Sequence, residues 1–140
     1  MKIQDAYQIL SQKPINSISE ILLPEMFGKI TRLEPITYQS RACYVLFTND
    51  SELVYFDNDG IIKLCLQEMT SAKSKIFSSQ NICAHLEEIW LPNTIECHSN
   101  FLIHAPELKR LYAPKLMKAG KFCNPLVYET IQKNQERSKQ

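Results

Sequence analysis

The sequence has little glycine and no long apolar run, and each absence excludes a class of protein. Its 140 residues include three glycines, so no glycine-rich loop is present to cradle the phosphates of a nucleotide. No apolar run approaches the roughly 18 residues that a membrane-spanning helix requires. Sixteen basic residues against fifteen acidic ones give a net charge of +1. This balance predicts neither a nucleic-acid partner nor insertion into a membrane.

A secretory signal is also missing from the start of the chain. Asp5 interrupts the stretch that would have to be apolar in such a signal. The cysteines are odd in number and irregular in spacing, which is typical of reduced thiols rather than a disulfide framework; they are Cys43, Cys65, Cys83, Cys97 and Cys123. We therefore expect a cytoplasmic protein, or one exported by a route that leaves no visible signal. The length predicts one domain over residues 1–140.

Local patterns predict a helix at each end and strands between them. Residues 3–12 carry apolar side chains at helical spacing, and Pro14 ends that helix. Asn124 and Pro125 suit the cap and the first turn of a second helix, so residues 126–140 are expected to form a helix and a tail. Residues 41–66 are rich in aromatic and branched side chains, and "DNDG" at 57–60 predicts the turn of an antiparallel hairpin there.

The phrases "LEEIWLP" (86–92) and "LKRLYAP" (108–114) share one pattern, and a third copy begins at Ile61. Each copy reads apolar-x-x-apolar-x-apolar, followed by a small apolar residue and then an apolar pair. The last two apolar residues of the first half point to the same side of a strand. One such unit cannot bury its apolar side alone, whereas stacked units bury a continuous core. The pattern therefore predicts repeated units with parallel strands over residues 61–125.

Two weaker copies lie upstream, within residues 18–60. "ISEILLP" (18–24) matches "LEEIWLP" well, and "ACYVLF" (42–47) matches it loosely. For the second of these, the hairpin is the competing interpretation. Residues 18–60 are thus either further repeat units or a hairpin region.

These phrases resemble leucine-rich repeats, and more closely the bacterial surface-antigen type. That unit runs roughly L-x-x-I-x-L-P, then I-G, A-F and a Cys; Leu86, Ile89, Leu91 and Pro92 take its first four places. The resemblance implies a curved solenoid with a parallel sheet on its concave side. It also implies recognition of a protein or ligand, generally without catalysis. The expected fold is α/β, a short irregular leucine-rich-repeat solenoid with flanking N- and C-terminal helices; the alternative is an α+β fold with an antiparallel hairpin.

Stacking the units predicts an exposed ladder of side chains between the apolar positions. Its two rows are Lys63, Glu88 and Arg110, which alternate in charge, and Cys65, Trp90 and Tyr112. An aromatic stripe flanked by charges has the composition of an interface centre. The sequence therefore predicts that these six residues bind a partner, either an unidentified protein or a second copy of the chain, without a cofactor.

Metal or catalytic chemistry is the alternative from a different functional class. A small α+β enzyme or metal-binding protein would use the cysteines and histidines that cluster in the second half; these are Cys83, His85, Cys97, His98, His104 and Cys123. Zinc sites use four N or S ligands in close pairs, but the usual C-x-x-C spacing is absent. Cys65 beside Lys63 is the weaker hypothesis of a nucleophilic thiol.

Overall fold

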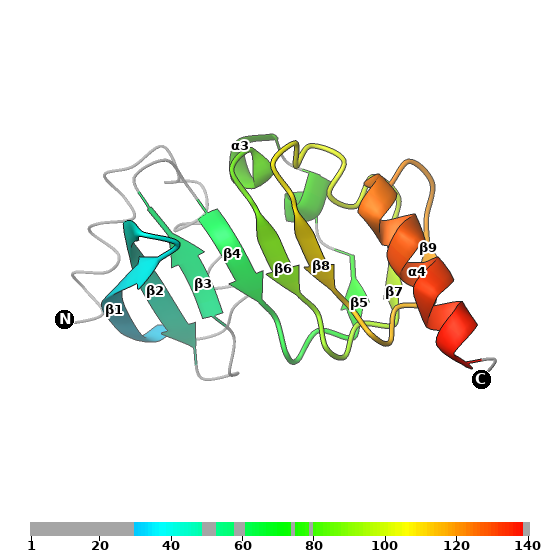
Figure 1. Ribbon diagram of the computed structural model, residues 1–140, viewed down its shortest axis with the longest axis horizontal. Helices are drawn as coiled ribbons and strands as arrows, with labels where there is room; N and C mark the ends of the chain where they lie inside the picture. The colour runs from blue at the N-terminus through cyan, green and yellow to red at the C-terminus, as the bar shows by residue number, and fades with distance from the viewer. Residues whose placement is uncertain (1–29, 49–52, 58–60, 74, 79, 139–140) are drawn as a thin grey trace.

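The computed structural model describes residues 30–48, 53–57, 61–73, 75–78 and 80–138. They form a mixed α and β structure, mainly sheet, with one long C-terminal helix (Figure 1). A six-stranded sheet has the order β1-β2-β3-β4-β6-β8. Its strands are β1 (Ile30–Tyr38), β2 (Arg41–Thr48), β3 (Leu53–Phe56), β4 (Ile61–Cys65), β6 (Glu88–Trp90) and β8 (Arg110–Tyr112). The expected helix at 3–12 and the upstream unit at 18–24 lie outside the described residues.

The first four strands form an antiparallel meander. The hairpin predicted around "DNDG" is confirmed, because β3 and β4 pair antiparallel. The weak repeat at 42–47 is wrong as a parallel unit, since β2 is antiparallel to both of its neighbours. Gln39 and Ser40 join β1 to β2 with φ of 50° and 66°. Two positive φ values make a tight type I′ turn, which asparagine and glycine normally occupy.

The strands β4, β6 and β8 pair in parallel, in the register predicted from the repeat. Leu64 lies beside Ile89, and Ile89 lies beside Leu111. Leu64 and Ile89 are 1% and 0% exposed. A slip of one residue would turn these side chains towards solvent, so burial of the apolar positions determines the register.

The second half of each unit contributes one strand to a second, three-stranded parallel sheet. Its strands are β5 (Ser71–Ala72), β7 (Glu96–Cys97) and β9 (Lys118–Ala119). The small residues aligned in sequence, Ala72, Cys97 and Ala119, are neighbours in this sheet. Between the strands the chain forms η2 (Lys75–Ser78) and α3 (Gln80–Cys83). The rings of Phe77 and Phe101 lie 4.9 Å apart in the core, and the N–H of Leu102 donates to the carbonyl of Phe77, the residue aligned with it.

Gly120 stands where two consecutive units approach each other closely. A Cβ atom there would lie 2.3 Å from the backbone nitrogen of Ser99 in the preceding unit. That separation is far below van der Waals contact, so no larger residue fits without a shift of the backbone.

Helix α4 (Pro125–Ser138) closes the β8 end of the structure (Figure 1). The predicted cap is confirmed, since Asn124 Oδ1 accepts a hydrogen bond of 3.0 Å from the N–H of Leu126. Val127 is fully buried in the core. Asn134 is also buried, and its Nδ2 donates hydrogen bonds of 2.8 Å to the carbonyls of Ala113 and Leu116. The helix thus satisfies backbone groups that a following unit would otherwise meet.

The structure contains features of both expected folds. The antiparallel hairpin belonged to the alternative, and the parallel strands belonged to the preferred expectation. Among the described residues, no helix combines the length and the apolar character needed to cross a bilayer.

Candidate functional site

All six residues of the predicted ladder lie on one face of the six-stranded sheet. The parallel register places Lys63, Glu88 and Arg110 in one row and Cys65, Trp90 and Tyr112 in the next. The rings of Trp90 and Tyr112 are in contact, with centroids 4.5 Å apart. Trp90 is 38% exposed and Tyr112 is 45% exposed. The single tryptophan is therefore on the surface beside a second aromatic side chain.

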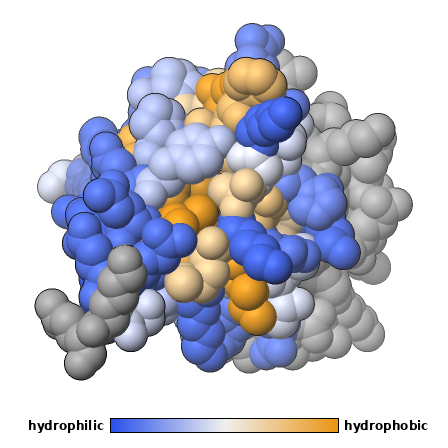
Figure 2. Space-filling view, turned by 90° about the vertical axis from the view of Figure 1, so that its right-hand side faces the viewer, coloured by the Kyte–Doolittle hydropathy of each residue, from blue (hydrophilic) through white to orange (hydrophobic). Residues whose placement is uncertain are grey.

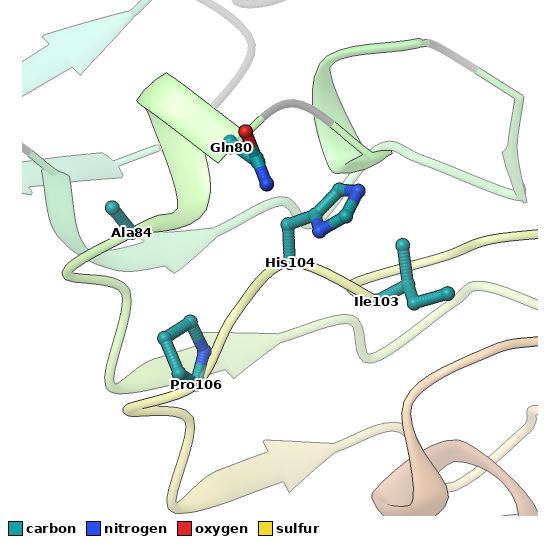
Figure 3. Close-up of a pocket in the computed structure, with 5 residues that line it drawn as sticks. All are labelled: Gln80, Ala84, Ile103, His104 and Pro106. Carbon is teal, nitrogen blue, oxygen red and sulfur yellow. The ribbon is translucent and has the colours of Figure 1, made fainter.

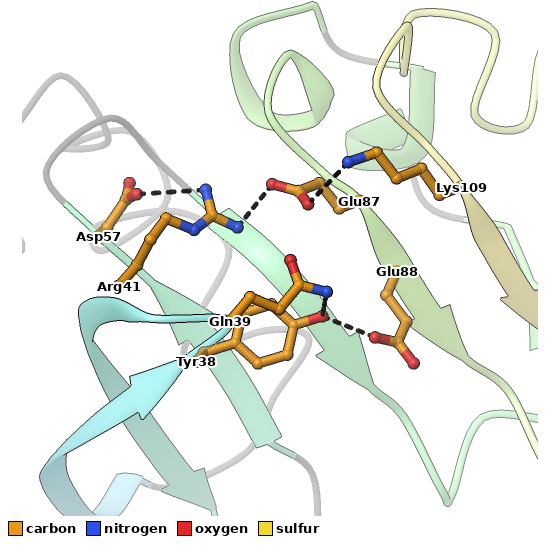
Figure 4. Close-up of polar contacts among 7 residues, drawn as sticks. All are labelled: Tyr38, Gln39, Arg41, Asp57, Glu87, Glu88 and Lys109. Atoms are coloured by element: carbon orange, nitrogen blue, oxygen red, sulfur yellow. Dashed lines mark hydrogen bonds and ion pairs between the residues drawn. The ribbon is translucent and has the colours of Figure 1, made fainter.

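Part of this face is covered by the chain itself. The hairpin tip, which we define as residues 38–41 between β1 and β2, reaches β6 from far away in the sequence (Figure 4). The hydroxyl of Tyr38 donates a 2.7 Å hydrogen bond to Glu88 Oε2, and Arg41 Nη2 donates one of 2.7 Å to Glu87 Oε2. The expectation that Glu88 is exposed is wrong: Glu88 is 5% exposed and its neighbour Glu87 is 7% exposed, because the hairpin tip packs against them.

Lys63 is held inside this covered half of the face. Its Nζ lies 5.1 Å from the ring centre of Tyr55, 5.4 Å from that of Trp90 and 5.6 Å from that of Tyr38. The same nitrogen is 3.9 Å from Glu88 Oε2. Three aromatic faces and a carboxylate stabilise the ammonium group, so its charge is used within the fold.

The ionisation of Glu88 reflects these contacts. Burial by itself would raise the pKa of Glu88, but the hydrogen bonds from Tyr38 and Trp90 and the charge of Lys63 together lower it. Trp90 Nε1 is the second donor, 2.5 Å from Glu88 Oε1. For Tyr38, burial and the neighbouring carboxylate raise the pKa of the phenol. Glu88 is thus a stable carboxylate that accepts from a neutral tyrosine.

Ion pairs extend the covered half around Glu87. Arg41 Nη1 lies 4.0 Å from Asp57, and Lys109 Nζ lies 3.5 Å from Glu87 Oε1. Arg41 therefore connects the hairpin tip to both β6 and the end of β3. The charges on this side balance one another, as Figure 4 shows.

The other half of the face, formed by Trp90, Arg110 and Tyr112, is exposed, and the hairpin tip does not cover it; we call it the open half. A hollow of about 360 Å³ lies between these side chains and α4, whose Leu126, Glu129, Thr130 and Lys133 form the opposite wall. A smaller hollow of about 170 Å³ shares Tyr112, Thr130 and Lys133 with the first and adds Arg137. We call the two adjoining hollows the α4 groove.

The sequence did not predict which residues pack beside each half of this face. On α4, residues 126, 129, 130, 133 and 137 recur at helical spacing, so their common face was readable, but its position against β8 was not. Tyr38 and Arg41 carried no signal, because "YQSR" lacks the asparagine and glycine that usually mark such a turn.

A further hollow of about 370 Å³ lies beside α3 (Figure 3). Gln80 and Ala84 line it from one side, and Ile103, His104 and Pro106 line it from the other. Among these residues, His104 carries the one imidazole. Acid–base or metal chemistry requires a second group, and the described residues of this lining do not supply one.

The cysteines and histidines do not form the cluster that the metal hypothesis requires. In the described part of the chain, no three His, Cys, Asp or Glu side chains lie close enough together to hold a metal ion. Cys97 and Cys123 are buried, and the Cys123 thiol lies 3.3 Å from the carbonyl oxygen of His98. Burial, followed by the neighbouring Cys123, raises the pKa of Cys97 to about 12.

Cys65 is half-buried rather than displayed on an open ladder. Burial raises the pKa of its thiol, and Lys63 only partly opposes that rise. A raised pKa leaves the neutral thiol, which is a poor nucleophile. The geometry therefore disfavours catalysis at Cys65.

Comparisons with protein-family models, curated proteins and solved structures found no match to this chain. The leucine-rich-repeat resemblance stays a prediction from the sequence.

Proposed function

We propose that this chain is a non-catalytic protein-interaction module, and that it binds a partner through the open half of its exposed strand face. The observation that carries the proposal is the contacting pair Trp90 and Tyr112, which stays exposed beside a groove. Tryptophan, tyrosine and arginine are the residues most enriched where interfaces derive their binding energy. Arg110 lies in the next row of the same face.

The proposal includes the leucine-rich-repeat solenoid as the architecture of residues 61–125. Two parallel ladders that advance together support it, since each unit places one strand in each sheet. Hydrogen bonds also recur from unit to unit: Leu66 N–H donates to the carbonyl of Trp90, and Leu91 N–H donates to that of Tyr112. Asn100 and Phe122, which occupy equivalent positions, have φ of 65° and 62°. A cytoplasmic location belongs to the same proposal, and the five free thiols support it.

The test replaces the aromatic pair by alanine in one variant, Trp90→Ala with Tyr112→Ala. Both side chains are more than a third exposed, and the main internal bond lost is the one from Trp90 to Glu88, so we expect cooperative unfolding with a loss of stability of about 1–2 kcal/mol. Quantitative capture from the source cell should lose the proteins that bind the wild type. The matched control is Ile95→Ala with Met117→Ala, an exposed apolar pair outside the groove, which should keep them.

Light scattering on the same variants distinguishes the two kinds of partner. A wild-type dimer that the aromatic variant dissolves would identify the partner as a second copy of the chain. An aromatic variant that unfolds, or that captures the same proteins as the wild type, would contradict the proposed binding surface.

A further inference from the structure

We propose that the segment seated in the α4 groove is acidic, a short peptide stretch of the partner protein that carries Asp or Glu beside an apolar side chain. This inference rests on the proposed function, because it assigns a chemical class to what the open half binds. It follows from the charges that line the groove, from the lack of ion pairs between three of them and any described residue, and from the size of the hollow.

The groove collects positive charge on a chain that is nearly neutral overall. Lys109 and Arg110 line it from the strand side, and Lys133 and Arg137 line it from α4. The whole chain has a net charge of only +1. Four cations around one groove are therefore a local feature, and they create a positive potential there.

Most of these cations are not neutralised inside the protein. Lys109 is shared with Glu87 at 3.5 Å. Arg110, Lys133 and Arg137 make no ion pair within 4.0 Å with any residue that the structure describes. Glu88 also lines the groove, but Tyr38, Trp90 and Lys63 already hold its carboxylate, and the nearby charge of Arg110 further stabilises it without an ion pair within 4.0 Å. Glu129 is the remaining carboxylate of the lining, so three unpaired cations face one unpaired anion.

The groove also offers apolar contact and room for an extended peptide. Trp90 and Tyr112 form one wall, and Leu126 lies opposite them. Figure 2 looks at this end of the molecule and shows apolar residues gathered within a hydrophilic surround. From Leu126 to Arg137 the helix rises about 17 Å. An extended chain of about five residues covers that length.

A protein segment fits better than a nucleic acid. A strand of nucleic acid carries one charge on every phosphate, and its affinity depends on neutralising several of them. Glu129 projects a negative charge into the same lining, and the chain as a whole is near neutral. An acidic peptide can bind beside Glu129, because the residues between its carboxylates carry no charge.

The experiment selects random hexapeptides on the purified full-length protein. We expect the enriched pool to carry two or more Asp or Glu per peptide together with an aromatic or aliphatic residue. The affinity of those peptides should fall about tenfold in Arg110→Gln with Lys133→Gln and Arg137→Gln, since each exposed pair contributes a few-fold. The loss should shrink as salt rises. The charge-matched control, Lys73→Gln with Lys118→Gln and Lys121→Gln, lies outside the groove and should stay within about twofold.

The other outcomes separate the two proposals. Neutral or basic peptides that still require Trp90 and Tyr112 would overturn the acidic segment and leave the binding surface standing. A selection that enriches nothing over the Trp90→Ala/Tyr112→Ala variant would overturn both. A short single-stranded DNA that binds more tightly than the peptides, with the same sensitivity to the three groove substitutions, would replace the peptide by a nucleic acid.

Discussion

The two halves of one sheet face differ in how their charged and aromatic groups are used. In the covered half, the hairpin tip, Lys63 and Glu88 bind one another, and little is left for a partner. In the open half, Trp90 and Tyr112 contact each other while Arg110 has no ion pair with a described residue. Both halves come from the same repeated strands, so the repeat alone does not make a binding site. A contact between residues 50 positions apart, Tyr38 and Glu88, separates them.

The largest expected effect is the loss of the carboxylate at the centre of the covered half. Glu88→Ala leaves the hydroxyl of Tyr38, the indole N–H of Trp90 and the ammonium of Lys63 without their common acceptor. Removing one member of a buried, charged network should cost about 2–4 kcal/mol in the free energy of unfolding. Urea unfolding followed by circular dichroism measures it.

Glu129→Ala is the matched change in the open half. Glu129 is exposed and makes no ion pair with a described residue, so we expect a change within about 0.5 kcal/mol. Equal losses from the two substitutions would show that the halves do not differ as described.

A smaller effect is expected when a single hydroxyl is removed from each half. Tyr38→Phe deletes the 2.7 Å hydrogen bond to Glu88 and should cost about 1–2 kcal/mol, as expected for a partly exposed bond to a charged group. Tyr112→Phe removes a hydroxyl that bonds to no described residue, and its cost should stay within about 0.5 kcal/mol. In a double-mutant cycle, the Tyr38→Phe loss should largely vanish in the Glu88→Ala background. Additive losses would indicate that the two side chains are not coupled.

The smallest expected effect is on how the free energy of unfolding declines at acidic pH. The pKa of Glu88 is lowered in the folded protein, so its contribution is complete above its unfolded value near 4.5 and is lost as the pH falls through the folded pKa. Glu88→Gln should flatten the decline of the unfolding free energy as the pH falls below 4.5, whereas Glu129→Gln should leave the slope as it is. An unchanged slope in Glu88→Gln would mean that other carboxylates control acid unfolding. Urea titrations at several pH values measure the slope.

The parallel register was predictable because apolar spacing carries it. Leu64, Ile89 and Leu111 repeat within their units, and burying them together leaves one alignment of β4, β6 and β8. The same alignment places Lys63, Glu88 and Arg110 side by side, so their alternating charges were predicted together with the register. Asn124 and Pro125 likewise marked the start of α4, since a helix cap depends on neighbouring residues alone.

The burial of Glu88 was not predictable, because it depends on a tertiary contact with no local signal. The aligned units predict that residue 88 is exposed, and the residues that cover it come from outside these units. Coverage comes from Tyr38 and Arg41, on a hairpin whose turn residues are atypical. The α4 groove has the same origin: the sequence predicted the helix, but not which strand it lies against.

The buried amide of Asn134 has a consequence for how many units the fold holds. Parallel ladders have no intrinsic length, because each edge strand offers the next strand the backbone groups that it needs. Asn134 lies on a helix and donates to the carbonyls of Ala113 and Leu116. A helix does not offer a strand edge on which another parallel strand could pair. A single side chain therefore helps set the boundary between a discrete molecule and an end that would recruit further strands.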